Sequence, residues 1–184
     1  MKKLSPIILL FMFSSFSPAQ GRFSIGIAGS AIFSLGEFGD NYGTGYGVTA
    51  TLLFSPSPVT DLTLSVGYNK WDKDNLGYTS IPLLAGFRYY YDLKGIKLYL
   101  PAFFGLHLST KEAKLPTAEV NGNIIGGNEI SLSNNYFGFG IGLGVLIPLS
   151  SKLYLDFSTT FNSMAASESN LNYIAINIGV LFGL

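Results

Sequence analysis

The stretch Tyr136-Phe137-Gly138-Phe139-Gly140-Ile141-Gly142-Leu143-Gly144-Val145-Leu146-Ile147 alternates bulky apolar residues with glycine over most of its length. Successive side chains of a β-strand point to opposite faces, so this spacing of two predicts a strand with one bulky face and one glycine face. A nucleotide-binding loop is the alternative, but these glycines lack the G-x-G-x-x-G spacing and the helix that such a loop needs. We interpret the glycine row as a packing device that makes room for bulky neighbours such as Tyr99 and Phe103.

Seven further segments show the same alternation and are separated by turn residues. They cover approximately residues 22–35, 44–55, 61–71, 79–92, 96–109, 152–162 and 171–184. Eight alternating strands joined in sequence predict an all-β fold, an eight-stranded antiparallel up-and-down β-barrel. The even number of strands returns both termini to the same side of that barrel.

The connections between these strands are of two kinds. Those at residues 55–58, 92–95 and 148–151 are short, whereas those at 36–43, 72–78, 110–135 and 163–170 are mostly longer and hold most of the charges. Short turns at one end and longer loops at the other are typical of bacterial outer-membrane barrels. We expect the longest loop, residues 110–135, to extend its strands as a hairpin, because residues 123–130 hold a Gly126-Gly127 turn between β-prone residues.

The composition also indicates a surface that does not face water. Of the 184 residues, 48% are hydrophobic and 12% are charged, against about 25% charged in an ordinary domain. The length suits one domain. The absence of cysteine excludes disulfides and cysteine-based metal sites, and a formal charge of +0 gives no reason to expect nucleic acid as a partner.

The first residues read as an export signal. Lys2 and Lys3 form a positive start, residues 7–13 are an apolar run, and Ser17-Pro18-Ala19 offers small residues at a cleavage site. The alternative, an uncleaved anchor, needs about 20 apolar residues. We therefore expect a signal peptide at 1–19, cleaved after Ala19, and a barrel domain at 20–184.

The face opposite the apolar one decides between a soluble, lipocalin-like barrel and a transmembrane one. That face consists of Gly, Ser, Thr, Ala and Tyr, with Arg88, Lys97 and Asp156 as its clear charges. A soluble surface needs about a quarter to a third of its residues charged, so we expect the apolar face to meet lipid. Aromatic residues near the strand ends would form the two interfacial girdles: Phe33, Tyr46, Tyr68, Phe137 and Phe161 at the loop end, and Phe23, Phe54, Tyr89, Tyr91 and Phe182 at the turn end.

Two prolines lie inside predicted strands. Pro82 and Pro101 each lack the N–H that a sheet ladder uses. We therefore expect β-bulges or shifted strand ends at these positions.

The last residues resemble the C-terminal recognition signal of outer-membrane barrels, with Asn177, Gly179, Phe182 and Leu184 at its positions. Together with the export signal and eight strands, the whole mature chain resembles the small outer-membrane β-barrel superfamily, that is the OmpA membrane domain and OmpX-like proteins. The resemblance implies location in the outer membrane, contact with outer-membrane lipid, and recognition of the last strand by the barrel assembly machinery. We expect a monomer without a cofactor.

The lumen of an eight-stranded barrel is just wide enough to be filled by side chains. Arg88 and Asp156 are expected to point inward at similar depth, and an ion pair between them would offset the cost of burying each charge alone. We interpret this pair as a structural plug; a gate or a ligand contact is the functional alternative.

We carry three hypotheses for the function. The leading one is a non-enzymatic envelope barrel whose loops make surface contacts or bind an extracellular ligand. The second is a lipid A-modifying acyl hydrolase, because His107 and Ser109 resemble the pair of outer-membrane deacylases and Glu112 or Glu129 could supply the acid. Side chains two residues apart on a strand are about 6–7 Å apart at the backbone, beyond the hydrogen-bond reach that a general base needs. The third is an OmpW-like conduit for small hydrophobic molecules, suggested by the inward apolar residues Leu53, Leu84 and Phe103.

Overall fold

The structure is a computed structural model, and it describes residues 21–114, 118–120, 123–125, 129–166 and 170–184. The expected signal peptide at 1–19 lies outside the described residues. Among those residues, no helix is long and apolar enough to cross a membrane.

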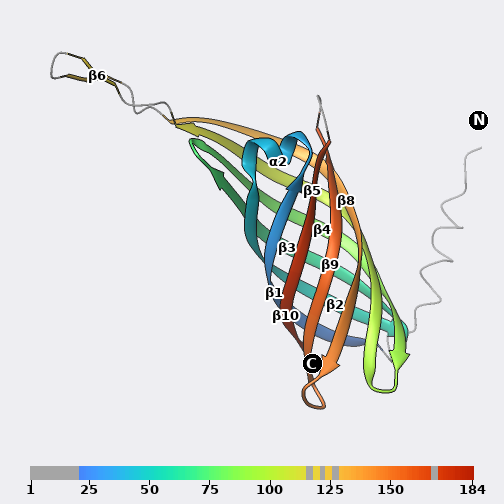
Figure 1. Ribbon diagram of the computed structural model, residues 1–184. Coiled ribbons are helices and arrows are strands. Elements are labelled where there is room, and N and C mark those ends of the chain that lie inside the picture. Colours follow the sequence, from blue (N-terminus) through green and yellow to red (C-terminus); the bar gives the residue numbers. More distant parts are fainter. Residues whose placement is uncertain (1–20, 115–117, 121–122, 126–128, 167–169) are drawn as a thin grey trace, which may run out of the picture.

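The chain forms one closed antiparallel barrel (Figure 1), which confirms the predicted fold class. Neighbouring strands follow in the order β1-β10-β9-β8-β5-β4-β3-β2 around the barrel. Each barrel strand therefore pairs with the barrel strands that precede and follow it along the chain, and β1 pairs with β10 to close the barrel. The barrel strands are β1 (Arg22–Leu35), β2 (Thr44–Ser57), β3 (Thr60–Lys73), β4 (Leu76–Leu93), β5 (Ile96–Lys114), β8 (Glu129–Pro148), β9 (Leu153–Ala165) and β10 (Leu171–Gly183). A short helix, α2 (Glu37–Tyr42), joins β1 to β2, and β6 (Ala118–Val120) pairs with β7 (Asn123–Ile125) as a separate two-stranded sheet.

The two ends of the barrel differ. The turn end carries the connections β2–β3, β4–β5 and β8–β9 together with the C-terminus, and the loop end carries α2 and the other connections (Figure 1). The turn between β4 and β5 consists of Lys94 and Gly95, which have φ values of 52° and 106°. Positive φ at both central residues is what a two-residue hairpin turn of this kind requires.

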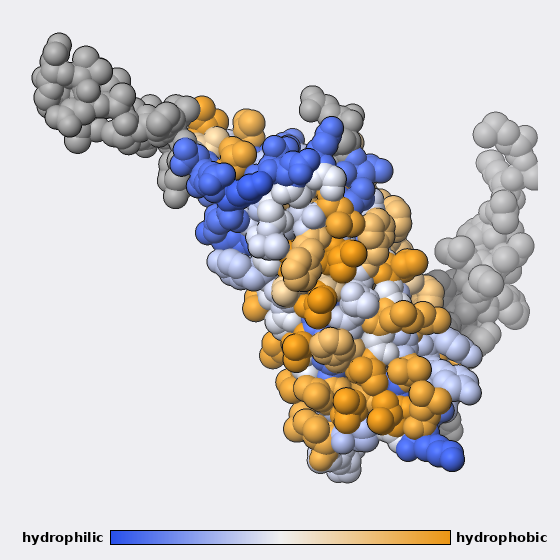
Figure 2. All heavy atoms as spheres, viewed as in Figure 1, coloured by the Kyte–Doolittle hydropathy of each residue, from blue (hydrophilic) through white to orange (hydrophobic). Residues whose placement is uncertain are grey.

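The bulky apolar side chains cover the outside of the barrel, as the alternation predicts. Ile27 is 61% exposed, Leu64 is 62% exposed and Leu143 is 62% exposed, although each lies inside a strand of the barrel. Figure 2 shows apolar residues over the barrel wall and hydrophilic residues gathered at the loop end. A lipocalin-like barrel would bury this face, so the structure has the apolar exterior of a transmembrane barrel.

One expectation about the shorter connections at the loop end is wrong. Residues 72–78 are not a long loop, because β3 continues to Lys73 and β4 starts at Leu76, with the turn residue Asp74 at φ 53°. The connection at residues 36–43 has the expected bounds, and it holds the helix α2.

The expected extension of the strands next to the longest loop is confirmed: β5 runs to Lys114, β8 begins at Glu129, and the two strands pair up to the row Lys114↔Glu129. The turn does not join residues 123–125 to residues 128–130 as expected, because Asn123 pairs with Val120 and Ile130 pairs with Ala113 of β5. The Gly126-Gly127 pair itself lies outside the described residues.

The structure does not contain the expected bulges at the two internal prolines. The register between β3 and β4 is the same on both sides of Pro82, and only the pairs between Val66↔Leu83 and Asn69↔Ser80 are missing. The β5–β8 register is likewise the same on both sides of Pro101. On one side of each proline the ladder lacks two successive pairs, while the pairs before and after them hold the register.

The register shift in the β2–β3 pair falls between Phe54 and Ser57, at the turn end of the barrel. This stretch includes Pro56. The irregularity lies next to the hairpin turn between β2 and β3, where a shift does not disturb the rest of the ladder.

Candidate functional site

A packed cluster of side chains closes the lumen near the turn end. Its buried members are Leu53, Tyr90, Tyr99, Leu146 and Leu181, with Tyr154 packed against them. They come from β2, β4, β5, β8 and β10, so side chains from different parts of the wall meet across the lumen. The lumen is therefore blocked at this level.

The structure brings Arg88 and Asp156 together directly above this cluster. The Arg88 Nη1 atom donates to Asp156 Oδ2 at 2.8 Å, and both side chains are largely buried. The Tyr99 hydroxyl also donates to Asp156, and the Arg88 guanidinium lies 4.5 Å from the centre of the Tyr99 ring. Each buried charge thus has a partner, and both are held by the same tyrosine.

A second buried carboxylate lies nearer the turn end. The Tyr90 hydroxyl donates to Asp61 Oδ2 at 2.7 Å, and Asp61 itself is buried. The amine of Lys97 lies 5.8 Å from the centre of the Tyr90 ring. Tyr90 and Tyr99 therefore each donate a hydrogen bond to one carboxylate in the lumen. The sequence pattern did not reveal this role.

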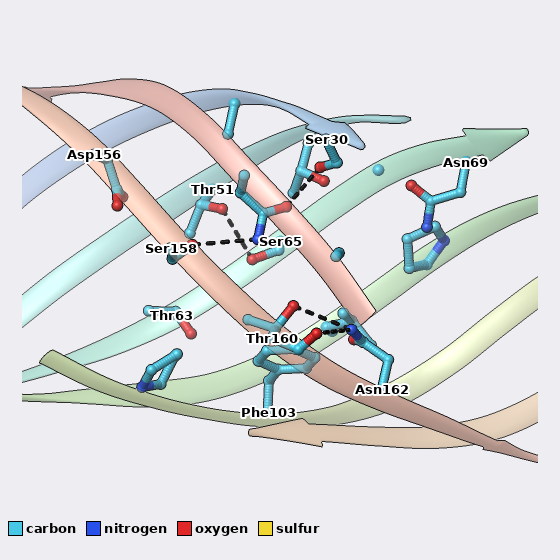
Figure 3. Close-up of a pocket in the computed structure, with 18 of the residues that line it drawn as sticks. Ser30, Thr51, Thr63, Ser65, Asn69, Phe103, Asp156, Ser158, Thr160 and Asn162 are labelled. Carbon is cyan, nitrogen blue, oxygen red and sulfur yellow. Dashed lines mark hydrogen bonds between the residues drawn. The ribbon is translucent and has the colours of Figure 1, made fainter. Parts of the chain in front are cut away.

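The middle of the lumen holds a cavity of about 120 Å³ that both polar and apolar side chains line. Small polar side chains of its wall bond to one another (Figure 3): Ser30 donates to Asn177 at 2.6 Å, and Asn177 donates to Ser158 at 3.2 Å. Leu84 and Phe103 also line it. The apolar residues that suggested a hydrophobic conduit are therefore separated, with Leu53 in the packed cluster and the other two on a cavity whose wall also carries hydrogen-bonded polar groups.

The glycine row of β8 has the packing role that its sequence predicts. A Cβ atom on Gly144 would lie 2.1 Å from the Tyr99 ring, and one on Gly140 would lie 2.4 Å from the Phe103 ring. A Cβ atom on Gly138 would lie 2.8 Å from the His107 ring. The bulky inward side chains of β5 thus occupy the space that the glycines leave free.

A second apolar cluster closes the lumen at the loop end. Phe38 of α2 is buried against Trp71 and Tyr78, with ring centres 5.3 and 5.2 Å away in edge-to-face arrangements. Trp71 in turn meets Tyr173 of β10 at 5.6 Å. We call this group of side chains the mouth cluster: Ile32, Phe38, Trp71, Tyr78, Met164, Leu171, Tyr173 and Ala175, with Tyr42, Tyr136 and Ala166 packed against it.

The helix α2 is inserted between two glycines with left-handed backbone conformation, Gly36 at φ 60° and Gly43 at φ 64°. Lys73 donates to the backbone carbonyl of Asp40 at 2.5 Å, which ties the helix to β3. Burial raises the pKa of the Tyr42 phenol above its ordinary value, and the neighbouring Tyr136 adds to this. The phenol of Tyr42 is therefore neutral where it packs over the mouth.

The candidate catalytic residues lie inside the barrel and do not touch each other. His107 and Ser109 are both buried, and Ser80 stands between them: its hydroxyl is 3.3 Å from His107 Nδ1 and 3.3 Å from the Ser109 hydroxyl. Glu112 lies on the opposite, outward face of β5, and the side chain of Glu129 lies outside the described part. Sequence reasoning missed Ser80, because it pairs with Ser109 only through the β4–β5 register.

Three residues of the C-terminal signal lie in β10, on both of its faces, and Leu184 follows the last residue of that strand. Asn177 points into the lumen, whereas Phe182 is 46% exposed on the outer wall and Leu184 is 61% exposed at the chain end. A Cβ atom on Gly179 would lie 2.3 Å from the carbonyl oxygen of Ile27, so this position needs glycine for the close approach of β1. Among the described residues, no group of three or more His, Asp or Glu side chains could hold a metal ion.

The barrel wall is taller on one side at the loop end. Strands β4, β5 and β8 continue outward to the rows Leu76↔Ala113 and Lys114↔Glu129, while β9 ends at Ala165. Pairing between β8 and β9 begins at Phe137↔Ala165. We call the outermost residues of four strands the projecting sheet: residues 70–73 of β3, 76–79 of β4, 110–114 of β5 and 129–133 of β8.

No protein-family model matches the sequence, and no curated protein matches it. Among solved structures, Neisserial surface protein A (NspA) has a TM-score of 0.63 at 17% identity, over 87% of this chain and 96% of that chain. A major outer membrane protein from Thermus thermophilus has a TM-score of 0.59 at 14% identity, over 88% and 99%. The outer membrane enzyme PagL has a TM-score of 0.51 at 14% identity, over 86% and 99%. At these identities the similarity is one of fold: the chain has the closed eight-stranded barrel of small outer-membrane proteins, as its resemblance to the OmpA membrane domain and OmpX-like proteins implies.

Proposed function

We propose that the protein is an integral outer-membrane barrel with a closed lumen, which acts through the surface of its loop end. The observation that carries this proposal is the pair of packed clusters, one at each end of the lumen. A route for solutes would have to pass both clusters and the Arg88–Asp156 pair between them. The loop end carries the hydrophilic residues and the projecting sheet, so it is the part that can make specific contacts (Figure 2).

This proposal places the loop end outside the cell and the turn end, with the mature N-terminus and the C-terminus, in the periplasm. It includes cleavage of the signal peptide after Ala19, contact of the exposed apolar wall with lipid, a monomeric state, and reading of Asn177, Gly179, Phe182 and Leu184 by the barrel assembly machinery. The support is the outward aromatic and aliphatic wall, together with the position of three of these residues on the last strand and of Leu184 directly after it.

The conduit hypothesis is less well supported by the lumen. Leu53 is fully buried in the turn-end cluster, and the cavity beyond it is lined by serine, threonine and asparagine side chains as well as Leu84 and Phe103. A hydrophobic molecule crossing this region would have to displace hydrogen-bonded polar groups, which costs about 1–3 kcal/mol for each group left without a partner.

The hydrolase hypothesis is less well supported by the placement of its residues. A lipid A acyl chain would lie against the outer wall, whereas His107, Ser80 and Ser109 all face the lumen beneath the mouth cluster. A base must lie within hydrogen-bond reach of its nucleophile and of the substrate. His107 lies within hydrogen-bond reach of the Ser80 hydroxyl, at 3.3 Å. It does not lie within reach of a lipid on the outer wall.

Four measurements test this proposal. Purified protein in a planar bilayer should show no stable open conductance, and steady channels would contradict the closed lumen. Protein from the outer-membrane fraction should migrate differently on gels before and after heating, and an amine label that cannot cross the membrane should reach Lys73 on intact cells. Lipid A masses should be unchanged between wild-type cells, cells lacking the protein and cells with His107→Ala; a mass difference would support the hydrolase instead.

A further inference from the structure

A wide pocket opens at the turn end of the barrel, on the turn side of the packed cluster that closes the lumen there. Its volume is about 780 Å³, within the range of about 300–1,000 Å³ that small-molecule sites usually have. Tyr90, Leu146 and Leu181 of that cluster line it, and so do Pro58 and Ser151 of the β2–β3 and β8–β9 turns. The pocket therefore ends on the cluster and opens among the turns (Figure 1). We call it the turn-end pocket.

Three basic side chains line the turn-end pocket from opposite walls. They are Arg22 of β1, Lys97 of β5 and Lys152, which directly precedes β9. Three strands separate β1 from β5 in either direction around the barrel, so Arg22 and Lys97 face each other across the lumen. Lys152 lies on the wall of Arg22, because its carbonyl accepts the Gly183 N–H at 2.8 Å and Gly183 pairs with Ser24 of β1.

The acids near these three bases do not neutralise them. Neither of the ion pairs among the described residues includes any of the three. Asp61 is the one acidic side chain of the described residues that lines the pocket, and the Tyr90 hydroxyl donates to it at 2.7 Å. Asp92 is the cross-strand partner of Lys97, but it accepts the Gly95 N–H at 3.1 Å in the β4–β5 turn and does not line the pocket. The side chains of the pocket therefore leave positive charge for a ligand to balance.

The remaining polar groups of the pocket are hydroxyls. Four serines line it: Ser24, Ser55, Ser57 and Ser151. Lysine, arginine and serine side chains all donate hydrogen bonds. A phosphate group matches this set, because it carries a charge of about −1.5 to −2 at about pH 7 and three strong acceptor oxygens. A carboxylate has less charge and fewer oxygens to offer to the same donors.

We propose that the turn-end pocket binds the phosphate group of an organic phosphate. The long side chains of Arg22 and Lys97 reach the phosphate from opposite walls, because the lumen of an eight-stranded barrel is only wide enough for side chains to fill it. The Lys97 amine lies 5.8 Å from the centre of the Tyr90 ring, so it is directed toward the floor of the pocket. Lys152 adds a third charge on the wall of Arg22. The proposed function concerns the loop end, so this site is an addition to it.

The pocket has room for more than the phosphate group, which alone would fill a small part of about 780 Å³. The rings of Tyr90 and Tyr154 and the side chain of Leu181 offer surface to the rest of the molecule. Two sources share this chemistry: a soluble sugar phosphate, and the headgroup of a phospholipid from the surrounding membrane.

The probe is glucose 6-phosphate, added to the full mature barrel in maltoside detergent, which contains no phosphate. Binding is followed by broadening of the phosphorus NMR signal. We expect binding to the wild type and at least about tenfold weaker binding to Arg22→Gln and to Lys97→Gln, each of which removes one charge from the pocket. The matched control is Lys94→Asn, which removes a charge from the same end of the barrel but outside the pocket, and should bind within about twofold. Asparagine tolerates the φ of 52° at this turn position.

Two further controls separate the site from general effects. Heat-dependent gel migration shows that each variant is folded, and Lys97→Arg, which keeps the charge, should bind within about threefold of the wild type. No binding to the wild type, undiminished binding to both Arg22→Gln and Lys97→Gln, or an equal loss in Lys94→Asn would overturn the inference. Displacement of the probe by an equal concentration of glucuronate would also overturn it, because a carboxylate would then be sufficient.

A comparison of two competitors identifies the source of the phosphate. Dihexanoyl phosphatidylglycerol and its deacylated headgroup, glycerophosphoglycerol, are each added against the probe. Stronger competition by the lipid supports the site with a membrane phospholipid as its ligand, and equal or weaker competition supports it with a soluble phosphate. These variants and probes do not involve the loop end, so a failure here leaves the proposed function standing. Labelling at Lys73 on intact cells tests that function separately.

Discussion

Gly144 and Tyr99 share one space in the lumen: a Cβ atom at Gly144 would lie 2.1 Å from Cζ of the Tyr99 ring. The two residues are paired across β5 and β8, and the Tyr99 hydroxyl is held by Asp156. The tyrosine therefore cannot turn away without giving up a hydrogen bond to a buried carboxylate. The missing side chain on one strand and the large one on the next act together to fill the turn end of the lumen.

Replacement of this glycine should destabilise the barrel. We expect Gly144→Ala to cost about 1–3 kcal/mol, because the added methyl group forces the Tyr99 ring from its place. The measurement is the urea midpoint of unfolding in lipid vesicles. Gly29→Ala is the control, since a Cβ atom there meets nothing within 4 Å; we expect a change within about 0.5 kcal/mol. Equal losses in the two variants would contradict the packing role.

The Arg88–Asp156 pair should be costly to break and much less costly to replace as a whole. Arg88→Met or Asp156→Leu alone leaves a buried charge without its partner, for which we expect a loss of about 3–5 kcal/mol. The double variant removes both charges and should lose clearly less than the sum of the two single losses. Unfolding of all four proteins in the same vesicles forms a double-mutant cycle. Additive losses would show that the two groups do not interact.

The sequence predicted the barrel, its strand order and its outward face. Alternation with a period of two predicts strands that are apolar on one face, and the scarcity of charges on the other face leaves only the apolar face to point outward. The packing of Tyr99 and Phe103 against Gly144 and Gly140 followed for the same reason. The turn-end and mouth clusters could not be read in the same way. The mouth cluster depends on the helix α2, which places Phe38 against Trp71, and the contact of Ser80 with Ser109 depends on the β4–β5 register.

The errors at the loop end have a common physical cause. Residues 72–78 and 130–133 resemble loops in the sequence because polar residues or glycine occupy their outward positions, whereas apolar residues occupy the outward positions in the rest of the barrel wall. Leu76, Tyr78, Ile130 and Leu132 nevertheless continue the alternation in the opposite phase. At this level the strands reverse their pattern without ending.

The misplaced hairpin has a different cause, because the longest connection holds two pairs of turn residues. Gly126-Gly127 is one, and Asn121-Gly122 is the other. Asn-Gly is the stronger signal for a two-residue turn, and it lies between the paired residues Val120 and Asn123.

The reversal of phase gives a test of where the lipid belt ends. Ile141 and Ser131 lie on the same outward face of β8, one inside the belt and one in the projecting sheet. We expect Ile141→Arg to cost about 2–4 kcal/mol, the range for arginine near the middle of a bilayer, and Ser131→Arg to cost about 0–1 kcal/mol. Folding equilibria in lipid vesicles measure both. Similar costs at the two sites would place the projecting sheet in lipid.

The attachment of α2 to the mouth should depend on one side chain. Phe38 is the buried residue of this helix, and it touches both Trp71 and Tyr78. We expect Phe38→Ala to release the helix, so that a protease cuts within residues 36–43 at least about tenfold faster, because local opening then costs less free energy. The barrel should stay folded, since its ladder does not include α2, and heat-dependent gel migration checks this. Glu37→Ala, at an exposed position of the same helix, should leave the cleavage rate unchanged. An unchanged rate in Phe38→Ala would show that Gly36, Gly43 and the Lys73 contact hold the helix without the ring.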